Sequence, residues 1–253
     1  GSCYAFGSLG ALESVIMISE NNPNLDIDLS EQFMVSCGSI CYIEEFVPGQ
    51  YLGMKGCFGS PFSTALNFIL EQGAFSEDYF KYVAKNSQCG AKEAGWNSNL
   101  YKISDWRVVE GGDNSIKNAL IEYGPLSTTM TCYENFKDYD GGVYTETSGE
   151  SGGHMILLVG WDDINQCWIC KNSWGTQWGE DGWFKISYGS SNIASLIYWV
   201  TYANLDIPIA DAGGPYYANI DEIIEFDGSM SYSPNNQIML YRWDFNSDEI
   251  WDT

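Results

Sequence analysis

The segment Gly1-Ser-Cys-Tyr-Ala-Phe-Gly-Ser-Leu-Gly-Ala-Leu-Glu-Ser-Val-Ile16 combines a cysteine with the pattern of a helix. Apolar side chains recur at the spacing of one helical face, at Ala5, Leu9, Leu12 and Ile16. The pattern predicts a helix that begins at or just before Cys3. The N-terminus of a helix carries a partial positive charge of about half a unit, which favours a thiolate over a thiol. Cys3 is therefore a candidate nucleophile.

The composition is that of a folded, acidic protein. Of the 253 residues, 45% are hydrophobic and 15% are aromatic, which excludes a disordered chain and allows one or two domains. The 34 acidic and 11 basic residues give a formal charge of -23, which disfavours nucleic acid and anionic membranes as partners. We expect this charge to serve solubility, with adaptation to salt or to a cationic substrate as the alternative.

The sequence contains no run of about 20 apolar residues, the length that a membrane-spanning helix needs. Residues 1–20 also lack the layout of a signal peptide. Because the chain begins inside the cysteine motif, we expect its natural N-terminus to lie upstream, together with any targeting segment.

Hydrophobic periodicity predicts helices first and strands later. Further helices are expected at residues 63–71 and 115–123. After Pro125 the pattern changes to strands, expected at residues 126–130, 155–159, 168–171, 183–187 and 197–202. A helical half followed by a sheet-rich half predicts an α+β fold of two subdomains, with a site at the seam between them.

His154 is the single histidine of the chain and precedes a short apolar run. It is the side chain that can accept a proton near neutral pH without a large pKa shift. Asn172 could hold the imidazole through its amide oxygen, with Trp174 and Trp178 shielding that hydrogen bond from water. Taken singly, His154 could instead be a structural histidine and Asn172 a turn residue.

Six blocks of the sequence form a set: Gly-Ser-Cys-Tyr-Ala-Phe at 1–6, Leu-Ser-Glu-Gln at 29–32 with Cys37 after it, Gly-Cys-Phe-Gly-Ser at 56–60, Gly-Pro-Leu-Ser at 124–127, Gly-His at 153–154, and Lys-Asn-Ser-Trp-Gly at 171–175. In order and spacing they resemble the papain family of cysteine peptidases, over residues 1 to about 202. Tyr4 stands where the family usually has Trp, and Gly153 where it often has Asp or Asn. Neither departure removes a residue of the implied triad.

The resemblance implies a catalytic triad. Cys3 would attack the peptide carbonyl, His154 would protonate the leaving amine, and Asn172 would align the imidazole. The family's oxyanion hole pairs the backbone N–H of the cysteine with a glutamine a few residues upstream, and that glutamine is not in this sequence. Loss of one such donor lowers the rate roughly 100- to 1000-fold, so the sequence as given could be nearly inert.

The resemblance also implies substrate-binding residues. Gly59 and Ser60 would pair with the substrate backbone, where the family usually has two glycines. The pocket for the second residue before the cut would be lined by Phe62, Thr129 and Met155, which suits a hydrophobic or aromatic side chain. Ordinary core packing is the alternative for these three. Trp174 is expected to contact the substrate as well.

The eight cysteines favour disulfides and an oxidising compartment. The resemblance implies a bond between Cys37 and Cys89, and a second from Cys57 to a residue before Gly1. Four cysteines have no counterpart in the family: Cys41, Cys132, Cys167 and Cys170. The last two form a CxxC pair, but it lies in a predicted strand, where positions three apart face opposite sides, so we predict no metal site or redox centre there.

The last part of the chain differs from the rest. Residues 204–253 resemble the start of a PKD domain, an immunoglobulin-like β-sandwich that is common on secreted and surface-layer proteins. The predicted domains are thus a peptidase domain at 1–203 and a partial, incomplete sandwich at 204–253.

These features predict a cysteine-type endopeptidase that works through a thiolate–imidazolium pair of Cys3 and His154 and through an acyl-enzyme thioester, and that needs no cofactor or metal. Its partners would be a polypeptide substrate and, in a precursor, its own propeptide, and it would be secreted or held at the cell surface. A weakly active or inactive binding protein on the same fold is the alternative, because fold alone does not fix function. A surface adhesin, suggested by residues 204–253, is a third hypothesis.

Overall fold

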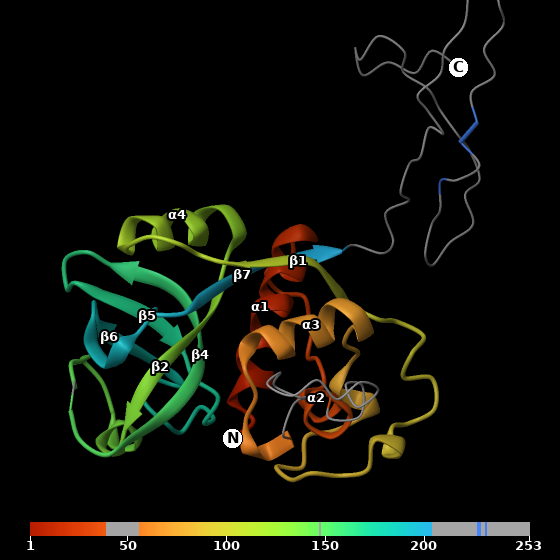
Figure 1. Cartoon of the computed structure of the whole chain (residues 1–253), viewed down its shortest axis with the longest axis horizontal. Coiled ribbons are helices and arrows are strands. Elements are labelled where there is room, and N and C mark those ends of the chain that lie inside the picture. Colours follow the sequence, from red (N-terminus) through yellow and green to blue (C-terminus); the bar gives the residue numbers. More distant parts are fainter. Residues whose placement is uncertain (39–55, 147, 204–226, 229–230, 232–253) are drawn as a thin grey trace, which may run out of the picture. The chain divides into compact units, whose positions relative to one another are not determined.

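The structure is a computed structural model of the whole chain that describes residues 1–38, 56–146, 148–203, 227–228 and 231 (Figure 1). The chain divides into two units, Gly1–Ala203 and Asn204–Thr253. The first unit is described below. The predicted β-sandwich lies outside the described residues, apart from three positions.

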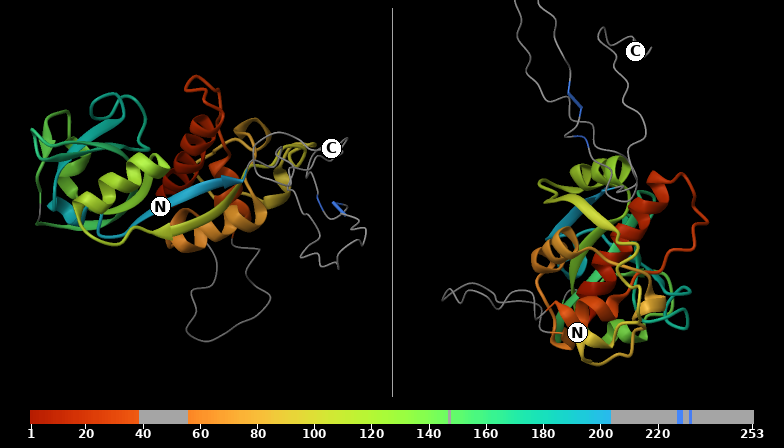
Figure 2. Two further views of the ribbon diagram at one scale, coloured as in Figure 1. Left: turned by 90° about the horizontal axis from the view of Figure 1, so that it is seen from above. Right: turned by 90° about the vertical axis from the view of Figure 1, so that its right-hand side faces the viewer.

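The longest helix, α1 (Cys3–Ser19), lies at the centre of the first unit. It packs against two shorter helices, α2 (Glu31–Cys37) and α3 (Phe62–Gln72), and on its other side against the sheet (Figures 1 and 2). Most of its first fourteen residues are buried, which explains why it is apolar around much of its circumference. The fourth helix, α4 (Asp113–Tyr123), packs against the sheet.

Seven strands form one sheet in the order β1-β7-β2-β4-β5-β6-β3. Every pairing is antiparallel except that of β3 with β6. The strands are β1 (Lys102–Val108), β2 (Leu126–Tyr133), β3 (Val143–Tyr144), β4 (Ser151–Asp162), β5 (Cys167–Lys171), β6 (Trp183–Ser187) and β7 (Ile197–Ala203). The predicted α+β fold is confirmed.

Two hydrophobic cores pack against the sheet, and neighbouring residues of β4 and β7 belong to different cores. One surrounds α1, α2 and α3, and the other fills the space between the sheet and α4, with Trp168 fully buried in it. A buried hydrogen bond from Ser127 Oγ to the carbonyl of Gly7, 2.7 Å long, joins α1 to β2. A Cβ on Gly7 would lie 3.2 Å from the ring of Phe62, so glycine permits this close packing of α1.

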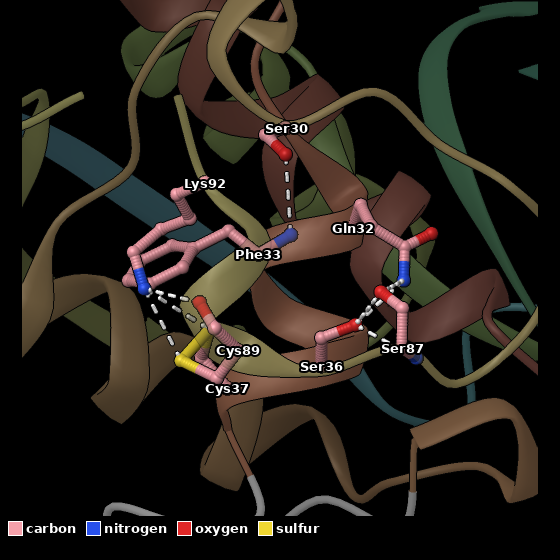
Figure 3. Close-up of a disulfide and its surroundings, with 8 residues drawn as sticks. All are labelled: Ser30, Gln32, Phe33, Ser36, Cys37, Ser87, Cys89 and Lys92. Atoms are coloured by element: carbon pink, nitrogen blue, oxygen red, sulfur yellow. Dashed lines mark hydrogen bonds between the residues drawn. A yellow bond between two sulfur atoms is a disulfide. The ribbon is translucent and has the colours of Figure 1, made fainter. Parts of the chain in front are cut away.

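A disulfide links Cys37, the last residue of α2, to Cys89, as predicted (Figure 3). The ammonium group of Lys92 donates to the carbonyl of Cys89 at 2.6 Å and lies 4.8 Å from the ring centre of Trp96. From α2, Gln32 Nε2 donates to the carbonyl of Lys85 at 3.0 Å, and the ring centre of Phe33 lies 5.6 Å from the Lys92 ammonium. These contacts attach the loop that carries Cys89 to α2.

The other described cysteines are free thiols: Cys3, Cys57, Cys132, Cys167 and Cys170. Cys41 lies outside the described residues. Among the described residues no helix is long and apolar enough to cross a membrane.

Candidate active site

Cys3 is the first residue of α1, so its side chain lies at the N-terminal end of the helix. Ser2 precedes it, and the Ser2 hydroxyl lies 2.6 Å from the hydroxyl of Tyr82. The adjacent Tyr4 is buried and donates its hydroxyl to the carbonyl of Gly56 at 3.1 Å. This bond holds the segment that contains Gly59 beside the start of α1. Cys3 thus stands in the first turn of α1, where the helix dipole carries its partial positive charge.

His154 and Asn172 come from neighbouring antiparallel strands. His154 lies near the start of β4, and Asn172 directly follows β5, which pairs with β4. The backbone N–H of Asn172 donates to the carbonyl of Gly182 at 2.9 Å, which fixes the backbone after the strand. His154 Nε2 lies 2.8 Å from Asn172 Oδ1. The predicted pairing of these two side chains is therefore present in the structure.

A second hydrogen bond defines the tautomer of the imidazole. The backbone N–H of Ser173 donates to Asn172 Oδ1 at 2.8 Å, so the atom that faces His154 is the carbonyl oxygen of the amide. An oxygen can only accept, so Nε2 of His154 must carry a hydrogen and donate it. Nδ1 is then the ring nitrogen that can take up or release a proton.

Aromatic rings cover the His154–Asn172 hydrogen bond. The ring of Trp174 lies 5.1 Å from that of His154, and Trp178 packs against Trp174 at 5.1 Å. The side chains of His154 and Asn172 are only 6% and 7% exposed. Phe136, fully buried, lies 5.5 Å from Trp174 and 6.5 Å from His154. The shielding expected from the two tryptophans is present, and Phe136 is a third ring that the sequence did not indicate.

Burial lowers the pKa of His154 below its usual value of 6.5, because the interior disfavours the charged imidazolium. The hydrogen bond to Asn172 opposes this shift. The neutral imidazole that results can act as a base.

Cys3 and His154 line one cleft of about 670 Å³. The helical side contributes Ser2 and Phe6, and the sheet side contributes Cys132 and Trp174. The cleft therefore lies at the seam between the helical and sheet parts, where the sequence predicted a site.

The predicted substrate-binding residues fall in four places. Trp174 lines the cleft and is 40% exposed, whereas the other five do not line it. Gly59 and Ser60 are partly buried beside the start of α1. Thr129 on β2 pairs directly with Met155 on β4, and both are partly buried. Phe62 is only 1% exposed and packs against Tyr198.

A smaller cavity of about 270 Å³ lies behind Asn172 and is lined by carboxyl groups. Glu13 on α1 accepts a hydrogen bond from the backbone N–H of Leu29 at 2.9 Å, and burial raises its pKa to about 7. Burial and the nearby charge of Glu13 raise the pKa of Glu31 on α2 to about 8. Asp28 and Lys171 also line this cavity. Within the described ranges no group of histidine, cysteine and acidic side chains is arranged to hold a metal ion.

The comparisons with known proteins agree with this geometry. Residues 1–202 match the family described as papain family cysteine protease. The chain belongs to the papain family of cysteine proteases. It is 32% identical over 212 residues to pro-cathepsin H of Mus musculus, covering 80% of this chain and 58% of that protein. It is 30% identical over 195 residues to cathepsin Z of Onchocerca volvulus, covering 74% of this chain and 61% of that protein.

A third relative, a cysteine proteinase of Trypanosoma brucei brucei, is 32% identical over 196 residues, which cover 76% of this chain and 40% of that protein. The chain thus spans between 40% and 61% of the length of these three relatives. Among solved structures, the cysteine protease CMS1MS2 of Carica candamarcensis in complex with E-64 has a TM-score of 0.65 at 24% identity, covering 79% of this chain and 88% of that one. At that identity the likeness shows the papain-like fold.

Proposed function

We propose that this chain is the catalytic part of a cysteine-type endopeptidase, with Cys3 as nucleophile, His154 as acid and base, and Asn172 as the positioning residue. One observation carries this proposal: a cysteine at a helix N-terminus and a histidine with a defined tautomer line the same cleft. A nucleophilic cysteine needs a nearby base and a positive environment, and both are supplied here.

The proposed reaction uses the free nitrogen of the imidazole. Nδ1 of His154 takes the proton of the Cys3 thiol, and the thiolate attacks the carbonyl carbon of the peptide bond. The imidazolium then gives that proton to the nitrogen of the leaving amine as the C–N bond breaks, which leaves a thioester on Cys3. His154 next takes a proton from water, which attacks the thioester and releases the acid and the thiol. The buried hydrogen bond to Asn172 keeps the ring oriented in both halves of the cycle.

The substrate in this proposal is an extended polypeptide. Its backbone would lie along Gly59 and Ser60, next to the start of α1. Thr129 and Met155, paired across β2 and β4, would contact an apolar side chain before the cut, with Phe62 supporting that pocket from beneath. Trp174, the exposed aromatic of the cleft, would contact the leaving part of the substrate.

We propose further that the protein is made as a precursor and exported. One relative, pro-cathepsin H of Mus musculus, is by its name a precursor. The disulfide between Cys37 and Cys89 favours an oxidising compartment. Residues 204–253, by their resemblance to a PKD domain, are proposed to begin a second domain of the kind found on exported proteins.

Labelling with the epoxide E-64 tests the function directly. We expect one molecule of E-64 to attach to each chain at Cys3, as read by intact mass and peptide mapping. Cys3→Ala should take up none, and Cys57→Ala, which removes another partly buried thiol, should react like the wild type. An inactive binding protein on the same fold predicts no attachment at Cys3, and that result would overturn the proposal.

A further inference from the structure

The cleft contains a second thiol that the proposed mechanism does not use. Cys132 lies near the end of β2, is free and partly buried, and lines the same cleft as Cys3 and His154. Burial raises the pKa of the Cys132 thiol, and the charge of a thiolate at Cys3 adds to that shift. The two thiols and the imidazole therefore occupy one site.

The register of the sheet places Cys132 next to the imidazole. On the antiparallel pair β2–β4, Met130 lies opposite His154 and Cys132 lies opposite Gly152. Residues opposite each other project to the same face, so Cys132 and His154 are diagonal neighbours on one face, a relation that brings Cβ atoms to about 7–8 Å or less. Gly152 has no side chain, and a Cβ built on it would meet nothing within 4 Å. The space opposite Cys132 on this face, above Gly152, is thus open to the cleft.

We propose that Cys132 is a resolving thiol for Cys3, so that oxidation by a hydroperoxide closes a reversible Cys3–Cys132 disulfide and switches the peptidase off. This inference rests on the role of Cys3 as nucleophile proposed above. In this proposal Cys132 is a site of oxidative modification, and it forms its disulfide with the proposed nucleophile, Cys3.

The chemistry proceeds in two balanced steps. The Cys3 thiolate attacks one oxygen of the hydroperoxide, the O–O bond breaks, and the products are a sulfenic acid on Cys3 and, after protonation, an alcohol or water. The thiol of Cys132 then attacks the sulfenic sulfur, forming the S–S bond and releasing water. In total two thiols are oxidised to one disulfide and one hydroperoxide is reduced.

The same imidazole serves the second step. A protonated thiol is a poor nucleophile, and burial keeps Cys132 in that form. Once Cys3 is a sulfenic acid, His154 is no longer paired with a thiolate. The neutral imidazole can then take the proton of Cys132 from its diagonal position on β4. The disulfide protects Cys3 from the irreversible sulfinic and sulfonic acids.

The test treats the whole chain with hydrogen peroxide and identifies cysteine products by mass spectrometry of non-reduced digests. In the wild type we expect a peptide in which Cys3 is joined to Cys132, with E-64 labelling at Cys3 lost and then regained after dithiothreitol. Cys132→Ala should accumulate sulfinic acid on Cys3 and regain no labelling. Cys167→Ala, which removes a free thiol on β5, should behave as the wild type.

Three outcomes would overturn the inference: no linked peptide, a link from Cys3 to Cys57, or full recovery of labelling in Cys132→Ala. Cys132→Ser provides a second variant if the alanine variant folds poorly, and near-complete labelling before oxidation shows that each variant is folded. A chain that forms the link but takes up no E-64 at Cys3 before oxidation would overturn the proposed function alone. A chain that cleaves peptides and forms no link would overturn this inference alone.

Discussion

The imidazole of His154 donates from Nε2 to Oδ1 of Asn172 over 2.8 Å, and the backbone N–H of Ser173 donates to the same oxygen. The hydrogen bond from Ser173 fixes which atom of the Asn172 amide faces His154. Because Ser173 holds the amide with its oxygen toward the histidine, Asn172 selects one tautomer of the ring as well as its orientation. A neutral amide does this without competing for the proton, which a carboxylate would do.

Asn172→Ala should lower kcat about 100-fold, the cost typical of small misplacements of a catalytic group. KM should change little, because Asn172 lies beneath the tryptophans rather than among the predicted substrate contacts. Steady-state kinetics on a peptide substrate measures both constants. Asn165→Ala, in the exposed turn between β4 and β5, is the matched control and should leave kcat unchanged. Wild-type kcat in Asn172→Ala would refute the positioning role.

The imidazole Hε1 signal in NMR spectra is assigned to His154 without ambiguity, because the chain has no other histidine. In Cys3→Ala, which removes the thiolate, we expect this signal to titrate below pH 6.5, since burial lowers the pKa of His154. In the double variant Cys3→Ala/Asn172→Ala the midpoint should fall further, because the hydrogen bond to Asn172 raises that pKa. A midpoint above 6.5 in Cys3→Ala would contradict the assigned effect of burial.

The sequence predicted the long elements and missed those with no periodic signal. Helix α2 has seven residues, all buried, so it has no polar face from which a helical period could be recognised. Strand β1 was missed because only one of its seven residues is buried and its partner β7 lies about a hundred positions later. Strand β3 is only two residues long.

Some residues of the candidate site could be predicted from the sequence, and others could not. The proposed triad residues stand in motifs, so their types and order were visible in the sequence. Phe136 stands in a short 3-10 helix, Glu134–Asp138, with no motif around it, and packing alone brings it near His154. Phe62 matched a family position, but a match in sequence does not tell how a side chain is buried. The approach of Glu13 to Glu31 depends on the packing of α1 against α2, which no local pattern encodes.

Glu31→Gln should stabilise the protein at alkaline pH. The pKa of Glu31 is raised from 4.5 to about 8, chiefly by burial, with the charges of Glu13, Glu77 and Asp28 adding to it. A carboxyl whose pKa is higher in the folded state stabilises the fold fully below its unfolded pKa and loses that contribution as pH rises through its folded pKa. The wild type should therefore lose stability between about pH 4.5 and 8.

Thermal unfolding across this range provides the measurement. The advantage of Glu31→Gln should be near zero at pH 4.5 and on the order of a few kcal/mol above pH 8. Glu93→Gln, at an exposed carboxyl, is the control and should show no such trend. Equal stability of Glu31→Gln and the wild type at both ends of the range would show that the Glu31 carboxyl does not titrate as described.

The Cys37–Cys89 disulfide closes a segment of 52 positions, and the double variant Cys37→Ala/Cys89→Ala should lose roughly 4 kcal/mol of unfolding free energy. The physical reason is that the bond restricts the unfolded chain. Dithiothreitol should lower the unfolding temperature of the wild type and leave that of the double variant unchanged. Cys57→Ala, which removes a free thiol, should keep the response of the wild type. If the double variant unfolds at the wild-type urea concentration, then the contacts of Lys92 with Phe33 and of Gln32 with Lys85 hold the loop to α2 without the disulfide.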